Sequence, residues 1–260
     1  MNNLNLKHIA EDLIDTFLKA GKIAKEISHK GVKITITADN SPVTNGDLIV
    51  DELLSNKIKD ITPTIPIISE ETVDLNNNLN KEDKDFWLVD PIDGTKDYIK
   101  KKDEYTLNAA LVVNLKPVLG IIYAPEKKRL FYSYGANNAF EINNGVKKKL
   151  KSKKVSTNEI IGLEHSGVTP PEVLKIYKKY KVTKKIKMSS SLKFCILAAG
   201  EADIYSANAR AFEWDIAAGH AILEHAGGYL TTHQEENILY KKKNFKNLDI
   251  IAKRSLHLEK

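Results

Sequence analysis

The stretch WLVDPIDGTKDY, residues 87–98, places two aspartates at the end of an apolar run. Asp90 follows a pattern typical of a buried strand, and Pro91 restricts Asp90 to extended backbone. Gly94 allows the chain to bend or to approach a ligand closely. Residues 95–102 are predicted to begin a short helix whose free N–H groups point back toward both aspartates, an arrangement that binds phosphate.

Two partly buried carboxylates this close together repel each other, and each costs several kcal/mol unless it is neutralised. A divalent cation bound by Asp90 and Asp93 would remove that cost. The alternative is an ordinary turn, in which Asp90 caps a helix and Asp93 is a turn residue.

The stretches IISEE and EWDIAAG supply further carboxylates. Glu70 and Glu71 end a short apolar strand, and Asp215 lies in the first turn of an apolar helix. Each has an ordinary explanation too, as the start of a solvated loop for the glutamates and as a helix cap for Asp215. Together the candidates are all oxygen donors, with no histidine or cysteine at ligand spacing, which favours Mg²⁺, Mn²⁺ or Ca²⁺ over zinc. Bridging carboxylates suit a two-metal site for in-line displacement at phosphorus.

The remaining pattern indicates an α/β fold. Apolar residues at three- and four-residue steps predict a helix over residues 4–28, and residues 47–60 form a second predicted helix. Residues 105–150 have the turn spacing of an antiparallel meander, and the rest of the chain alternates helix and strand. We expect residues 1–150 and 151–260 to be two halves of one body rather than independent modules.

Composition excludes several classes of protein. The 42% hydrophobic and 28% charged content is that of a globular chain, and no apolar run approaches the roughly 18 residues of a membrane span. The single cysteine, Cys195, cannot form an intramolecular disulfide, so we expect a cytoplasmic location. The net charge of +6 comes mostly from lysines of solvated faces, which favours small anionic substrates and predicts no nucleic-acid partner.

DPIDGT, residues 90–95, with the upstream glutamate pair and the downstream WD and AAG, resembles the inositol monophosphatase superfamily of lithium-sensitive, magnesium-dependent phosphomonoesterases. The resemblance runs from SPVTNGD at residues 41–47 to EWDIAAGH at residues 213–220. GTKDY, SSSLKFC and EWD look most like its 3′(2′),5′-bisphosphate nucleotidase branch. The resemblance implies a layered α-β-α-β-α sandwich, in which residues 1–150 carry most metal ligands and residues 151–260 add Asp215 and substrate contacts.

The resemblance also implies a site. Glu70, Asp90 and the carbonyl of Ile92 would bind one Mg²⁺; Asp90, Asp93 and Asp215 would bind a second, and Glu70 a weaker third through water, with Mn²⁺ as a possible substitute. Asp47 and Thr95 would pair to orient and deprotonate the attacking, magnesium-activated water. The spacing of Thr44 and Asp47 also fits a helix capping box, which is compatible with that role.

The implied reaction is hydrolysis of adenosine 3′,5′-bisphosphate to AMP and phosphate. SSSLKFC could be only a helix N-cap, but the resemblance makes it a nucleotide contact, with Lys193 facing the second phosphate as a point charge. The N–H groups of Gly94 and Thr95 would receive phosphate oxygens. The full set of implied substrate contacts is Glu70, Ile92, Asp93, Gly94, Thr95, His165, Ser190, Ser191, Lys193 and Asp215.

Two departures keep the substrate open. The nucleotidases usually have an arginine where this chain has Leu163, and a proline-rich, arginine-bearing loop where it has residues 207–211, although Arg210 could substitute. An inositol monophosphatase or related sugar-phosphate phosphatase is therefore the alternative. A non-enzymatic metal-ligated or nucleic-acid-binding protein is a third hypothesis, disfavoured by the water-activating pair. The family contains both monomers and homodimers, and either is expected here.

Overall fold

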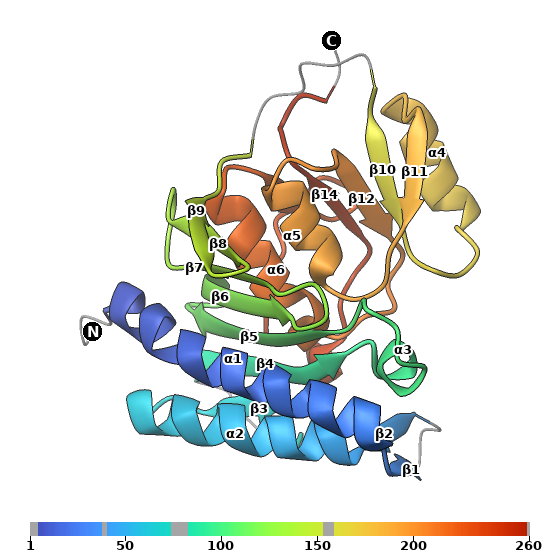
Figure 1. The fold of residues 1–260 in the computed structure, drawn as a ribbon. Coiled ribbons are helices and arrows are strands. Elements are labelled where there is room, and N and C mark those ends of the chain that lie inside the picture. Colours follow the sequence, from blue (N-terminus) through green and yellow to red (C-terminus); the bar gives the residue numbers. More distant parts are fainter. Residues whose placement is uncertain (1–4, 38–40, 74–82, 153–158, 259–260) are drawn as a thin grey trace.

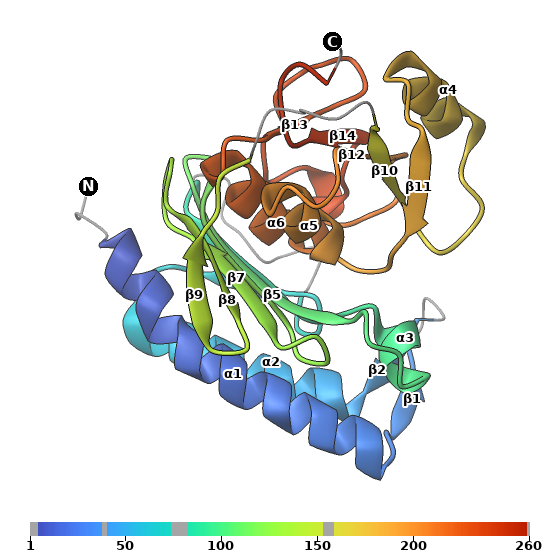
Figure 2. The same ribbon diagram turned by 45° about the horizontal axis from the view of Figure 1, so that its top comes forward.

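Helices and sheets alternate as five layers in the computed structural model, which describes residues 5–37, 41–73, 83–152 and 159–258 (Figures 1 and 2). The predicted α-β-α-β-α sandwich is confirmed. In order, the layers are α1 (Leu6–Lys30) with α2 (Asn45–Ile61), a seven-stranded sheet, α5 (Leu192–Ala198) with α6 (Glu213–His225), a five-stranded sheet, and α4 (Pro171–Lys179).

The first helix forms because its apolar residues share one face. Leu13, Phe17 and Ala24 are fully buried against the seven-stranded sheet, while the opposite face is charged. The side chain of Asn5 accepts a hydrogen bond of 3.1 Å from the backbone N–H of His8 and so caps the helix. The predicted helix over residues 4–28 is thus confirmed, with its ends displaced by two residues.

The larger sheet contains the predicted meander. From β4 onward each strand pairs antiparallel with the next, whereas β3 and β4 pair in parallel, which brings the ends of both predicted carboxylate-bearing strands to one edge. Its strands, in spatial order, are β3 (Ile67–Ser69), β4 (Phe86–Asp93), β5 (Thr106–Val113), β6 (Lys116–Ala124), β7 (Arg129–Ser133), β8 (Ala139–Asn143) and β9 (Val146–Lys149).

The smaller sheet is mixed and belongs to the second half of the chain. Its order is β11 (Lys184–Lys187), β10 (Ile161–Glu164), β12 (Ile204–Ala207), β14 (Ile250–Lys253) and β13 (Tyr229–Thr231). A hairpin of β1 (Ile34–Ile36) and β2 (Pro42–Thr44), the short helix α3 (Thr95–Ile99) and the 3₁₀ turn η1 (Lys243–Phe245) complete the described elements. The division of the chain near residue 150 stays a prediction.

Helix α6 is apolar on nearly all sides because it lies between the two sheets. It approaches β6 so closely that a Cβ on Gly120 would lie 2.3 Å from the carbonyl oxygen of Ala218. Only glycine permits this contact, which fixes the height of α6, and of Asp215 in its first turn, above the sheet. Neighbouring α5 buries Cys195 completely, as a small apolar side chain.

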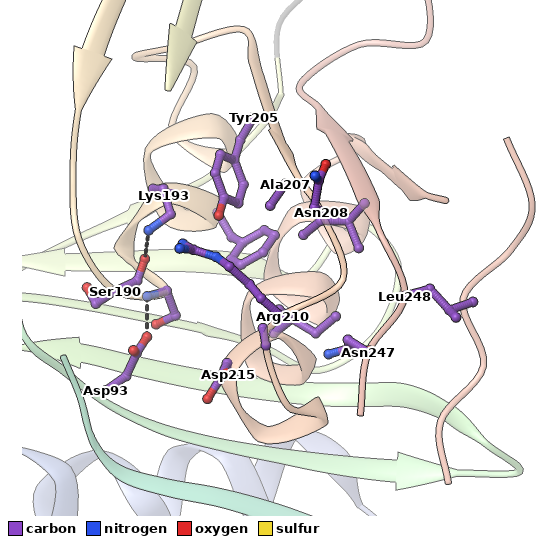
Figure 3. Close-up of a pocket in the computed structure, with 15 residues that line it drawn as sticks. Asp93, Ser190, Lys193, Tyr205, Ala207, Asn208, Arg210, Asp215, Asn247 and Leu248 are labelled. Atoms are coloured by element: carbon purple, nitrogen blue, oxygen red, sulfur yellow. Dashed lines mark hydrogen bonds between the residues drawn. The ribbon is translucent and has the colours of Figure 1, made fainter. Parts of the chain in front are cut away.

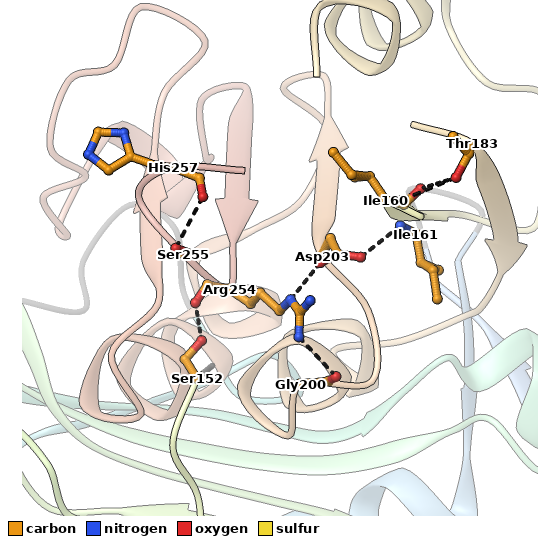
Figure 4. Close-up of polar contacts among 9 residues, drawn as sticks. All are labelled: Ser152, Ile160, Ile161, Thr183, Gly200, Asp203, Arg254, Ser255 and His257. Carbon is orange, nitrogen blue, oxygen red and sulfur yellow. Dashed lines mark hydrogen bonds and ion pairs between the residues drawn. The ribbon is translucent and has the colours of Figure 1, made fainter. Parts of the chain in front are cut away.

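A buried ion pair joins the C-terminal strands to the rest of the smaller sheet (Figure 4). The carboxylate of Asp203 accepts hydrogen bonds from the Arg254 guanidinium at 2.5 Å and from the Ile161 backbone N–H at 2.7 Å. A second guanidinium nitrogen of Arg254 donates to the carbonyl of Gly200 at 3.3 Å.

Arg254→Met should lower the free energy of unfolding by about 3–5 kcal/mol, because it leaves the Asp203 carboxylate buried without its cation. Urea titration measures the change. Lys179→Met, which removes the exposed pair with Glu235, is the control and should cost less than about 1 kcal/mol. Equal losses in both variants would contradict the role given to the buried pair.

Candidate metal and substrate site

A β-bulge separates the two aspartates of the opening stretch. Asp90 pairs with Asn108 and Asp93 pairs with Thr106. Between these two pairs β4 advances by three residues and β5 by two, so β4 contains one extra residue. In a regular strand, residues three apart face opposite sides of the sheet. The extra residue rotates the strand and brings both carboxylates to the same site, and Pro91 is tolerated there because a bulge leaves a ladder N–H unused.

Three carboxylates converge at this edge of the sheet. Glu70, Asp90 and Asp215 each offer an oxygen within 4.8 Å of the others. The backbone N–H of Glu70 donates to the carbonyl of Val89 at 3.1 Å, which continues the parallel pairing and places Glu70 beside Asp90. Asp215 accepts a hydrogen bond of 2.8 Å from the N–H of Phe212, which orients its side chain at the start of α6.

The pKa values of these carboxyl groups are raised. Burial raises the pKa of Asp90 well above its usual range, with repulsion from Glu70 as the next cause. Although its side chain reaches solvent, desolvation by the surrounding protein, followed by repulsion from Asp215, raises the pKa of Glu70 to about 9. Burial and then Asp93 raise the pKa of Asp215 to about 7. Each group therefore favours a nearby cation.

The donor chemistry fits magnesium. The Oδ1 atom of Asp90 is buried and has no hydrogen-bond partner among the described residues. An orphaned carboxylate oxygen inside a group of oxygen donors is the environment expected of a hard divalent cation. The cluster could therefore hold Mg²⁺ or Mn²⁺.

Asp93 and Ile92 lie at the margin of this cluster. A carboxylate oxygen of Asp93 accepts a hydrogen bond from the backbone N–H of Ser191, and Asp93 shares a cavity wall with Asp215. The carbonyl oxygen of Ile92 accepts from the Thr95 hydroxyl at 3.1 Å. Their assignment as metal ligands stays a prediction.

Thr95 also faces Asp47. Its hydroxyl lies 3.4 Å from Asp47 Oδ1, while Asp47 Oδ2 accepts from the backbone N–H of Thr44 at 2.8 Å. The predicted capping box is confirmed, and it leaves Oδ1 directed toward Thr95. Gly94 adopts the left-handed conformation, with φ of 94°, that opens the first turn of α3.

A cavity of about 300 Å³ extends from Asp93 and Asp215 to a cationic end (Figure 3). Lys193 is only 5% exposed, and its ammonium donates to the carbonyl oxygens of Ser190 at 2.5 Å and Met188 at 3.3 Å. Arg210 reaches across the cavity, so that its guanidinium points toward Lys193. Among the described residues, neither cation forms an ion pair within 4.0 Å, but the charges of both act on Asp93, where they oppose the rise in its pKa that burial causes.

The structure contradicts part of one of the two interpretations of the serines at residues 189–191. Ser191 stands at the N-cap position of α5, but its side chain makes no capping hydrogen bond: its hydroxyl donates to Asn108 Oδ1 at 2.7 Å, and its backbone is already helical, with φ of −66°. The N-cap interpretation is therefore wrong for the Ser191 side chain, whereas the Ser190 hydroxyl oxygen accepts a hydrogen bond of 3.4 Å from the backbone N–H of Leu192 at the start of α5. Ser190, with φ of 56°, makes the turn that directs the Ser191 N–H at Asp93.

His165 lies in a smaller adjoining cavity of about 40 Å³, where its Nδ1 accepts from the backbone N–H of Gly167 at 2.9 Å. Burial lowers its pKa. Leu163 is fully buried in the core and does not line the described cavities. Leu163 therefore contributes no side-chain atoms to the walls of these cavities.

Several residues that line the cavity were not predicted from the sequence. Tyr205 stands beside Lys193, whose ammonium lies 5.1 Å from the ring centre, and Asn247 and Leu248 form the far wall (Figure 3). A strand tyrosine and a loop far along the chain give no local signal of a site. Glu70 itself lines a second cavity, of about 440 Å³, together with residues that include Glu71, Thr95 and Trp214.

The model of the inositol monophosphatase family matches residues 5–258. The chain belongs to that family. The 3′(2′),5′-bisphosphate nucleotidase CysQ of Buchnera aphidicola is 40% identical over 214 residues, which cover 82% of this chain and 79% of that protein. CysQ of Escherichia coli K12 is 33% identical over 212 residues, 81% of this chain and 84% of that protein.

Solved structures of the inositol monophosphatase family share the fold. CysQ from Bacteroides thetaiotaomicron is 30% identical and matches 97% of this chain and 98% of its own, with a TM-score of 0.79. An IMPase of Thermotoga maritima, 22% identical, matches 93% of this chain and 90% of its own, with a TM-score of 0.73. Among the described residues, no helix is long and apolar enough to span a bilayer.

The melting temperature of the Asp90→Asn variant should no longer depend on Mg²⁺. A metal at 100 times its dissociation constant adds about 2.7 kcal/mol to the free energy of unfolding, so Mg²⁺ should raise the melting temperature of the wild type. The variant keeps its shape but loses a repelled charge, so without metal it should melt no lower than the wild type. Its melting temperature should not respond to Mg²⁺.

Scanning fluorimetry with Mg²⁺ and with EDTA measures both effects. Asp60→Asn, on the exposed end of α2, is the matched control and should keep the full response. A response to Mg²⁺ in Asp90→Asn as large as in the wild type would disprove the cluster as the metal site.

Proposed function

We propose that this protein is a Mg²⁺-dependent phosphomonoesterase that hydrolyses adenosine 3′,5′-bisphosphate to AMP and phosphate. The observation that carries the proposal is the polarity of one cavity. Asp93 and Asp215, the second of which belongs to the carboxylate cluster, line one end, and Lys193 and Arg210 line the other. A substrate with two separate phosphates matches both ends. The relatives named as 3′(2′),5′-bisphosphate nucleotidases, at 33–40% identity, support this assignment.

In this proposal Glu70, Asp90, Asp93, Asp215 and the carbonyl of Ile92 hold two Mg²⁺ ions, with Glu70 anchoring a weaker third and Mn²⁺ as a substitute. When bound, these ions neutralise charge on the phosphate and make water a stronger nucleophile at neutral pH. The raised pKa values and the orphaned Asp90 oxygen support the assignment, because buried carboxylates that repel one another are stabilised by a bound cation.

The protein's own groups then position the reaction. Thr95 orients the attacking water through its hydroxyl, and Asp47, which faces that hydroxyl, draws the proton away. The N–H groups of Gly94 and Thr95, at the start of α3, receive phosphate oxygens. Attack in line with the 3′ oxygen breaks the P–O bond, and no covalent enzyme intermediate is required.

Selectivity in this proposal comes from the cationic end. Ser190, Ser191, Lys193 and His165 contact the nucleotide, and Lys193 faces the phosphate that is not cleaved. Arg210 supplies the guanidinium that the changed loop would otherwise lack, since it lies in the same cavity. The buried, unpaired Cys195 supports a cytoplasmic setting.

Wild-type protein should release phosphate from adenosine 3′,5′-bisphosphate only with Mg²⁺ or Mn²⁺, and Asp90→Asn should be inactive. Inositol 1-phosphate at the same concentration should be hydrolysed much more slowly. Phosphate release is measured for both substrates. Faster hydrolysis of inositol phosphate would favour the alternative substrate, and no hydrolysis of either by folded protein would reject the enzyme assignment.

Arg210→Ala should raise KM for adenosine 3′,5′-bisphosphate by about 10- to 100-fold, the range of a lost charge-assisted hydrogen bond. KM for adenosine 3′-monophosphate, which lacks the second phosphate, should change by less than about threefold. Lys148→Ala, on the exposed strand β9, makes the same change of net charge and should alter neither value. Equal effects of Arg210→Ala on both substrates would contradict the second-phosphate role.

A further inference from the structure

Residues 241–248, here called the strap, cross the N-terminal end of α6 before the chain enters β14. Three of its non-glycine residues have positive φ: Lys241 at 70°, Asn244 at 55° and Phe245 at 52°. Such conformations are unfavourable and persist only where surrounding contacts over-determine them. The strap therefore needs strong external contacts to keep its shape.

Glu213 supplies the most concentrated of these contacts. Its side chain is fully buried, yet both carboxylate oxygens are used. Oε2 accepts from the backbone N–H of Lys241 at 2.8 Å, and Oε1 accepts from the backbone N–H of Lys242 at 2.9 Å and from its ammonium at 2.7 Å. A buried carboxylate with three charge-assisted hydrogen bonds is a rigid anchor.

The far end of the strap is tied to the same helix start. Asn247 donates its side-chain N–H to the carbonyl of Phe212 at 2.6 Å and its backbone N–H to the carbonyl of Ala211 at 2.9 Å. Between these two sets of hydrogen bonds, the centre of the Phe245 ring lies 6.0 Å from the centre of the Trp214 ring.

The strap and the helix start each contribute to the site. Asn247 and Leu248 of the strap line the cavity, and Asp215 of the helix lies two residues after Glu213 (Figure 3). Glu213 itself is not among the lining residues. It therefore acts through its neighbours: the strap on one side and the first turn of α6 on the other.

We propose that Glu213 is a positioning residue that holds the strap, and with it the Asn247 wall of the cavity, in register with Asp215. The inference rests on the proposed function, because it gives Glu213 a part in substrate and metal binding at that site. A purely structural Glu213 would affect stability alone.

Glu213→Gln tests the distinction. The amide keeps the size of the side chain but has one acceptor, and its NH₂ group would face a backbone N–H of the strap. KM for adenosine 3′,5′-bisphosphate should rise at least tenfold, and calorimetric titration should show Mn²⁺ binding weakened at least fivefold. Glu213→Asp, which keeps both acceptors on a shorter stem, should recover part of each loss.

Two controls separate this effect from general damage. Glu141→Gln removes another buried carboxylate, bound by Arg129 at 2.6 Å on the sheet away from the cavity, and should lower the melting temperature only. Lys242→Met keeps both backbone hydrogen bonds to Glu213 and should raise KM by less than about threefold. A Glu213→Gln variant that melts lower but binds substrate and Mn²⁺ like the wild type would overturn the proposal.

The remaining outcomes are also decisive. Failure of the wild type to hydrolyse the bisphosphate would reject the proposed function, while the Mn²⁺ titration would still test Glu213. Should Glu213→Gln not fold, amide hydrogen exchange of the wild type replaces it. The Lys241 and Lys242 amides should exchange at least 100-fold more slowly than free peptide and slow further with Mn²⁺, and exchange that Mn²⁺ leaves unchanged would overturn the inference.

Discussion

The rest of the structure depends on holding the carboxylates of Glu70, Asp90 and Asp215 close together, where they are poorly solvated and repel one another. Glu70 follows β3, Asp90 lies in β4 and Asp215 in α6, so no single element would bring them together. Their assembly is unfavourable without a cation, as their raised pKa values show. The folding energy of the layers must therefore hold the cluster in place until a metal compensates its charge.

The architecture meets that constraint with short-range devices. Parallel pairing of β3 with β4 sets Glu70 beside Asp90, and the contact between Gly120 and Ala218 sets the height of the helix that carries Asp215. The cavity beside Asp215 carries positive charge at its opposite end, where the ammonium of the buried Lys193 donates to two backbone carbonyl oxygens. One cavity thus has carboxylates at one end and an ammonium and a guanidinium group at the other.

Local patterns were sufficient for much of the fold and for the residue types of the site. The helix periodicity, the meander and the capping box at Thr44 were all predicted correctly, because each depends on neighbours within a few positions. The bulge at Asp90 was not predicted, since it is defined by the register of β5. The role of Ser191 was ambiguous for a similar reason: its hydroxyl partner, Asn108, comes from a distant strand. Asn247 and Glu213 depend on contacts between segments far apart in the chain, which no local pattern encodes.

The burial of Cys195 has a consequence for the chemistry of the whole chain. It is the single cysteine in the sequence, its side chain is fully enclosed in α5, and burial raises the pKa of its thiol well above the ordinary range. Thiolate is the form that reacts with oxidants and alkylating agents. Burial therefore protects the Cys195 thiol of the native protein from such reagents, and thiol labelling should report separation of the layers.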